Sequence, residues 1–230
     1  MIRISIHLAA AVLLAGLLLS GCVRSGILSQ AVTPSYVPSN VFKEAVSVPA
    51  QIRRVAVLPL SVLNEEDADM AFGRDTLMPV LLGELNRARI FEVVTVSGDE
   101  LRLISGKGVW NAEEKLPPEF FDRIKAKFGA DAVLFSRLTM YRAYEPLAIG
   151  WRIKLIDADE PHILWAVDEV FDARDPSVAA AAVRHAQSSP DTASSLADSR
   201  SVLQSPRRFG RYTAHAVIGT MPERAVAARE

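Results

Sequence analysis

Arg53-Arg54-Val55-Ala56-Val57-Leu58-Pro59-Leu60 is an apolar run, rich in β-branched residues, that begins after two charged side chains. A continuous apolar run of this length is typical of a central strand that is covered on both faces. Pro59 has no backbone N–H and should mark the end of the strand. We therefore expect this stretch to lie inside a sheet that helices cover.

The segment that follows has the pattern of an amphipathic helix. Leu77, Leu81 and Leu85 recur every four residues and define its apolar face. Pro79 leaves two alternatives. Either Asp75 or Thr76 caps the helix, so that the proline falls in the first turn, or the helix begins near Asp69 and bends at the proline.

The next elements continue the alternation of strands and helices. Phe91–Val96 has the composition of a short strand. Ser97-Gly98-Asp99-Glu100 has the spacing of a capping box and predicts a brief helix as far as Ile104. Pro117–Lys127 predicts another helix, which Gly129 should end.

After Gly129 the pattern changes to strands joined by short turns. Residues 132–144, 151–155 and 163–172 show alternating side chains, and turns this short predict two successive antiparallel hairpins. Two C-terminal helices follow, over 178–186 and after Ser205. The fold class is therefore α/β (α+β), a single domain with a mixed sheet of about five strands packed by helices.

The N-terminus carries a targeting signal. Arg3 precedes an apolar core from Leu8 to Leu18, which is the length of a secretory signal and shorter than the about 20 residues of a membrane span. Leu19-Ser20-Gly21-Cys22 ends this core and resembles a bacterial lipobox. The resemblance implies cleavage before Cys22 and acylation of that cysteine with a diacylglycerol and an N-acyl chain. The alternatives are an ordinary signal peptide and an uncut N-terminal anchor.

These signals divide the chain into a signal peptide (1–21), the lipidated cysteine with a flexible, proline-interrupted tether (22–50), a periplasmic α/β domain (51–222) and a tail (223–230). Residues 187–205 are serine-rich and predict a mobile loop within the domain. Arg24 follows Val23, so the position after Cys22 is not the aspartate that retains a lipoprotein at the inner membrane in enteric-type bacteria. By analogy we expect the periplasmic face of the outer membrane.

The order of these elements resembles that of the periplasmic α/β domains of bacterial lipoproteins. Val55–Pro59 at the first strand and Phe128–Leu134 at the entry to the hairpins carry the likeness. The group includes CsgG, LpoB and the N-terminal domain of TolB, and the likeness covers roughly residues 53–221. It implies a non-catalytic module that binds other envelope proteins, with no catalytic residue to transfer.

The composition and motifs also favour a non-catalytic protein-binding module. Lys plus Arg and Asp plus Glu number 26 and 27, so no concentrated basic character points to nucleic acid. The three histidines of the mature chain lack a metal-binding spacing, and no metal or other cofactor is expected. Asp168, Glu169 and Asp172 could in principle serve a hydrolase, but pairing across the hairpin with Arg137, Arg152 or Lys154 is the expectation for such residues.

Binding therefore has to come from a surface. Trp110, in the polar loop 107–115, is an aromatic of the kind that anchors a protein partner, although it could instead pack under its own loop. Tyr141 and Tyr144 should point away from the helix-covered face and form a second candidate patch.

Three functions remain open at this point. The first is a lipid-anchored accessory or scaffold that binds an envelope protein complex. The second is a subunit of a homo-oligomeric ring in a secretion-related assembly, and the third is an envelope hydrolase that uses the carboxylates.

Overall fold

The computed structural model describes residues 36–188 and 200–225, which form one mixed seven-stranded sheet with helices. The strands in this part of the chain are β1 (Val41–Lys43), β2 (Arg54–Val57), β3 (Ser61–Val62), β4 (Glu92–Thr95), β5 (Ala132–Arg142), β6 (Ala148–Asp157) and β7 (Ile163–Asp172). The helices are α3 (Ala68–Ala88), α4 (Gly98–Ser105), α5 (Phe120–Phe128), α6 (Pro176–Ser188), α8 (Pro206–Ile218) and the 3-10 helix η3 (Arg200–Leu203).

The sheet joins a parallel part to an antiparallel part. Its order is β1-β7-β6-β5-β2-β4, and β3 also pairs with β5. The pairs of β2 with β4 and β5, and of β3 with β5, are parallel, whereas β5, β6, β7 and β1 pair antiparallel. The two predicted hairpins are β5–β6 and β6–β7, and the predicted α/β class is confirmed.

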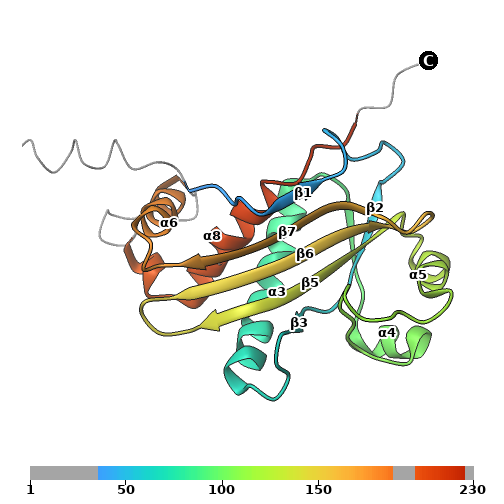
Figure 1. The fold of residues 1–230 in the computed structure, drawn as a ribbon, viewed down its shortest axis with the longest axis horizontal. Helices are drawn as coiled ribbons and strands as arrows, with labels where there is room; N and C mark the ends of the chain where they lie inside the picture. The colour runs from blue at the N-terminus through green and yellow to red at the C-terminus, as the bar shows by residue number, and fades with distance from the viewer. Residues whose placement is uncertain (1–35, 189–199, 226–230) are drawn as a thin grey trace, which may run out of the picture. The chain divides into compact units, whose positions relative to one another are not determined.

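Helices cover the two faces of the sheet unequally. One large apolar cluster packs α3, α6 and α8 against one face, with Trp151, Trp165 and Phe171 among its members. A smaller cluster packs α4 and α5 against the other face, over Ala56 and Val133. Figure 1 shows α3 and α8 behind β5, β6 and β7, and α4 and α5 to one side of these strands. The second face of the antiparallel part therefore has no described helix over it.

The sequence explains why the helices begin and end where they do. Ser97 and Glu100 form the predicted capping box of α4, and Gly129 ends α5 in the left-handed conformation. Asp67 caps α3, so this helix begins at Ala68 and contains Pro79 in its interior. Of the two alternatives for this helix, the early start is therefore the one observed.

The sheet has seven strands rather than about five, because two short strands were not predicted. β1 lies in the range assigned to the tether and pairs with Trp165–Val167 of β7. β3 lies just after Pro59, where the chain pairs with β5 again after the break that follows β2. Each has at most three residues, too few for a periodic pattern to show.

The end of the described chain is also held in place. Val48 donates its N–H to the carbonyl of Glu223 and accepts the N–H of Ala225 at its own carbonyl. Residues 223–225 of the predicted tail thus pair with the segment before β2. Residues 1–35, 189–199 and 226–230 lie outside the description, and with them the signal peptide, Cys22 and most of the predicted mobile loop. Within the described ranges, no helix combines the length and the hydrophobicity of a membrane span.

Candidate protein-binding face

The uncovered part of the sheet is here called the open face. It consists of the side chains of β1, β7, β6 and the second half of β5 that point away from α3 and α8. The paired positions along it are Phe42, Ala166 and Lys154 in one row, and Asp168, Arg152 and Arg137 in the next. Val170, Gly150 and Met140 form the third row, and Asp172, Ala148 and Arg142 form the fourth.

Large apolar side chains on this face are accessible to solvent. Phe42, Val170 and Met140 are 52%, 46% and 39% exposed. Residues on the opposite face of the same strands, such as Trp151 and Phe171, are completely buried. Apolar side chains exposed together on one surface are typical of protein-binding sites.

Three cations from β5 and β6 meet on the open face. Arg137, Arg152 and Lys154, here called the cation triad, come from neighbouring positions of the two paired strands. Arg152 pairs with Asp168 of β7, with 2.7 Å between Nη2 and Oδ2. This pair was expected from the alternation of the hairpin, and surface pairs of this type contribute about 0.2–1 kcal/mol.

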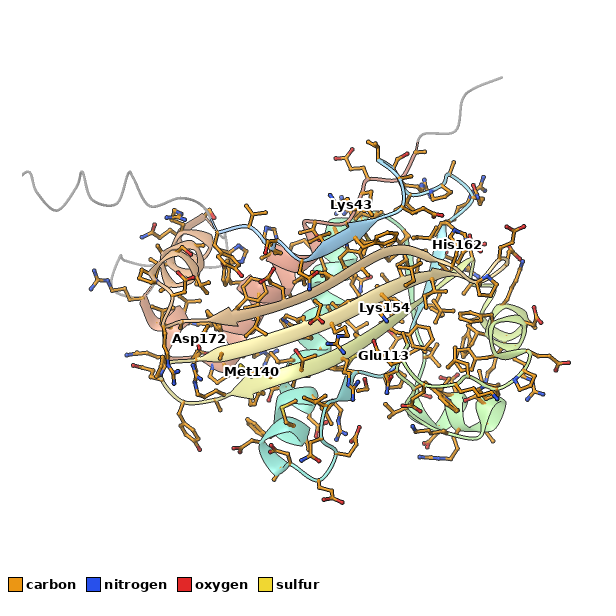
Figure 2. All side chains as sticks on the ribbon, viewed as in Figure 1. Lys43, Glu113, Met140, Lys154, His162 and Asp172 are labelled. Atoms are coloured by element: carbon orange, nitrogen blue, oxygen red, sulfur yellow. The ribbon has the colours of Figure 1, made fainter. Side chains whose placement is uncertain are left out.

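The other two cations meet a carboxylate from outside the sheet. Glu113, from the loop between α4 and α5, places Oε1 2.8 Å from Nζ of Lys154 and Oε2 3.6 Å from Nη1 of Arg137. Figure 2 shows Glu113 next to Lys154 over the strands, with Met140 and Asp172 farther along them. Burial raises the pKa of Glu113, but the hydrogen bond and charge of Lys154 and the charges of Arg152 and Arg137 outweigh it, and the pKa is lowered overall.

A groove of about 310 Å³ opens beside the triad. Its lining combines apolar, polar and charged residues: Asn40, Phe42, Glu113, Arg152, Lys154, Ala166, Val167 and Asp168. A partner that fits here must therefore offer both an apolar group and a group that complements the charges.

The remaining carboxylates of β7 have structural partners. Asp172 pairs with Arg142, at 2.9 Å. Glu169 lies on the other side of the strand and accepts hydrogen bonds from Tyr36 Oη and from the backbone N–H of Ser39. The three carboxylates of the hydrolase hypothesis are thus spread over both sides of β7 and engaged in separate contacts.

The expected exposure of Tyr141 is wrong. The register of β5 with β6 shifts between Leu138 and Met140, so that Thr139 is an additional residue in β5. This bulge turns Tyr141 onto the helix-covered face opposite Ile149, where its side chain is only 8% exposed. Tyr144 lies beyond the bulge in the turn after β5 and is 79% exposed, as expected.

Trp110 packs within its own part of the chain. Its indole N–H donates to Oγ of Ser105 at 2.8 Å, its ring meets the edge of Phe120, and Nζ of Lys107 lies 5.1 Å from the ring centroid. These contacts agree with the packing alternative that was left open for this residue. They fix the loop from which Glu113 reaches the open face.

The folded chain brings two histidines together that are distant in sequence. The rings of His185 on α6 and His215 on α8 are 4.6 Å apart, and Nδ1 of His215 lies 3.4 Å from Oε2 of buried Glu84. In the described ranges, no group of three or more potential ligands could hold a metal ion. The predicted lipidation site Cys22 and the preceding Leu19, Ser20 and Gly21 lie outside these ranges.

The sequence could have indicated the cations of the open face but not their counterion. Arg137, Arg152 and Lys154 follow from strand alternation once the hairpin is placed. Glu113 has no such signal, because it lies in a loop of irregular structure 24 residues before Arg137. The bulge at Thr139 likewise leaves no periodic mark.

No protein-family model matches this sequence, and no curated protein is significantly similar to it. Solved structures to which the chain is similar include lipoprotein GNA1162 from Neisseria meningitidis, at 18% identity and a TM-score of 0.38 over 52% of this chain and 79% of that one. The PelC dodecamer from Paraburkholderia phytofirmans has 13% identity and a TM-score of 0.40, covering 80% and 98% of the two chains. The LpoB C-terminal domain from Salmonella enterica has 16% identity and a TM-score of 0.34, covering 56% and 86%. These are distant similarities, and the open face rests on the geometry of this chain alone.

Proposed function

We propose that this chain is a non-catalytic accessory lipoprotein of the bacterial outer membrane that binds an envelope protein through the open face. Cys22 would carry the acyl chains and hold the domain at the periplasmic side of the membrane. The residues after it would act as a spacer. The sheet would then provide the binding surface.

The observation that carries this proposal is the unequal covering of the sheet. The antiparallel strands bury Trp151, Trp165 and Phe171 on one face, yet expose Phe42, Met140 and Val170 on the other. Antiparallel sheets often have one solvated face, but that face is then polar. Apolar side chains set among ion pairs are instead typical of a protein interface, which has an apolar centre and a polar rim.

The lipobox supports the anchoring part of the proposal. Replacing Cys22 with alanine removes the only cysteine of the chain and hence the acylation site. In cells labelled with radioactive palmitate, we expect label in the wild-type chain and none in Cys22→Ala. Label that persists in the variant would contradict lipid anchoring at this residue.

The binding part can be tested by the size of the complex that the protein forms. We expect the wild-type chain, solubilised from membranes in mild detergent, to migrate on a native gel as a complex larger than its own mass. Val170→Asp should shift it to the free protein, since it places an unpaired charge in the interface. Leu103→Asp is the matched control, because Leu103 is an exposed apolar residue on α4, outside the open face. Equal migration of all three proteins would contradict the proposal.

A further inference from the structure

The cation triad departs from a general rule of strand pairing. Arg137 and Arg152 stand directly opposite each other in the antiparallel pair of β5 and β6, and Lys154 follows on the same face. Like charges at opposed positions of two strands destabilise the pair. A local arrangement that opposes stability is the kind of feature that functional sites contain.

Carboxylates of the described residues provide only some of the ion pairs and hydrogen bonds that the three cations of the triad can form. Asp168 is used by Arg152, through both Nε and Nη2. The contact of Arg137 with Glu113, at 3.6 Å, is longer than a hydrogen bond. Nε of Arg137 is buried and has no hydrogen-bond partner among the described residues. The carboxylates around the triad thus pair closely with Arg152 and Lys154 but only loosely with Arg137.

Glu113 shows which kind of anion the site accepts. It does not belong to the sheet but reaches the triad from a loop, and its two oxygens lie against cations of two different strands. The carboxylate is therefore an internal occupant of a position that another carboxylate could share or take over. Phe42 and Ala166, which are paired in β1 and β7, contribute apolar side chains to the lining of the same groove.

We propose that Arg137, Arg152 and Lys154 form a binding site for the carboxylate of an acidic peptide segment, with Glu113 as the chain's own occupant that the incoming group displaces. An apolar group next to the acidic residue would lie against Phe42. The proposal rests on the proposed function, because it names the class of partner segment that the open face would bind. It goes further by assigning the specificity to charge.

The test uses the full chain, purified in detergent, and fluorescein-labelled pentaglutamate as the probe. Fluorescence anisotropy should show that pentaglutamate binds at least about tenfold more tightly than pentaglutamine, which has the same length and no charge. The affinity should fall as the salt concentration rises, because the contacts are ionic. Equal binding of the two peptides would overturn the proposal, and so would binding of inorganic phosphate in preference to pentaglutamate.

Variants assign the binding to these residues. Lys154→Gln and Arg152→Gln should each weaken the binding of pentaglutamate several-fold with the fold retained, as shown by circular dichroism. Glu113→Gln should strengthen it, because the internal competitor is lost. Glu114→Gln is the matched control, since the neighbouring carboxylate pairs with Lys107 and Asn111 instead of the triad. Unchanged affinity in both Lys154→Gln and Arg152→Gln would overturn the site.

Failure of this inference can be distinguished from failure of the proposed function. If Val170→Asp releases the native complex but pentaglutamate does not bind, the open face holds a partner that is not acidic. If pentaglutamate binds through the triad while Val170→Asp leaves the complex intact, the triad is an anion-binding site but the proposed protein interface around Val170 is contradicted. Only the first result contradicts the inference.

Discussion

The ring of Tyr141, on β5, lies directly against the backbone of Gly73, on α3. A β-carbon at Gly73 would lie 2.6 Å from Cγ and 2.8 Å from Cδ1 of the tyrosine ring, closer than atoms can pack. The contact holds α3 close to the far end of the sheet and requires both the glycine and the bulge that turns Tyr141 inward.

Gly73→Ala should therefore destabilise the fold by about 1–3 kcal/mol, because the added methyl group must displace the buried ring. Gly83→Ala, in the same helix, is the matched control, since nothing lies within 4 Å of a β-carbon there. This variant should gain about 0.5–1 kcal/mol, the usual preference for alanine in a helix. Chemical denaturation measures both, and equal effects would show that Tyr141 does not pack as described.

The bulge itself can be tested by removing one residue. Deleting Thr139 would remove the additional residue and restore a regular register, with Met140 still opposite Gly150 and Tyr141 still opposite Ile149, against Gly73. We expect a loss of less than about 2 kcal/mol, because the strand pairing and the buried ring of Tyr141 are retained. Thr139→Ala keeps the residue count and should change the free energy of unfolding by less than about 1 kcal/mol. A loss of about 3–5 kcal/mol, comparable to removal of a buried aromatic side chain, would argue against the bulge, because deletion from a regular strand would turn Tyr141 to the open face.

A buried hydrogen bond joins α8 to the centre of the sheet. Trp151 donates its indole N–H to Oγ1 of Thr213, at 2.9 Å, and Thr213 donates to the carbonyl of Gly210 at 3.0 Å. Thr213→Val keeps the volume but leaves the buried N–H without an acceptor, which should cost about 1–3 kcal/mol. Thr213→Ser retains the acceptor and should cost about 1 kcal/mol for the lost methyl group. The prediction fails if the valine variant unfolds like the wild type.

The histidine pair should make stability depend on pH. Burial, together with the charges of His215, Arg211 and Arg87, lowers the pKa of His185 to about 4 from an ordinary value of 6.5. The unfolded chain then binds a proton below pH 6.5 that the folded chain binds only below pH 4. Stability from this residue is thus full above pH 6.5 and is lost progressively as the pH falls towards 4.

His185→Phe should reduce the loss of stability between pH 6.5 and 4 by about 1–2 kcal/mol, a figure that allows for the partial exposure of the ring. His162→Gln is the control. The carbonyl of Glu160 and the charge of Glu44 raise the pKa of His162, whose contribution therefore has the opposite sign. Thermal unfolding over this pH range measures the slopes. An unchanged slope in His185→Phe would contradict the assignment.

The order of the main elements could be predicted from sequence because local chemistry specifies each of them. Alternation places Trp151, Ile153 and Leu155 on one face of β6, and the capping box of Ser97 and Glu100 begins α4. These signals act within a few residues of the positions they determine. Element order and fold class could therefore be derived before any tertiary contact was known.

Tertiary contacts determine the features that the sequence did not reveal. β1 forms because three residues pair with the edge of β7, which is distant in sequence. The bulge lets Tyr141 pack against Gly73. Thr139 then lies over Gly150, where a side chain would clash with it. Glu113 reaches the triad because Trp110 packs its loop. In each case the partner is distant in sequence, so no local pattern could reveal it.

The most direct test of the open face is photo-crosslinking in the native host, with a photoreactive amino acid at Val170 and, as the control, at Leu103. We predict that Val170 gives an adduct with another envelope protein, that Leu103 gives none, and that Arg152→Gln weakens the adduct. A band from Leu103 but not from Val170 would contradict the account. An adduct from Val170 with a second copy of the chain would contradict it too and would favour the homo-oligomeric ring.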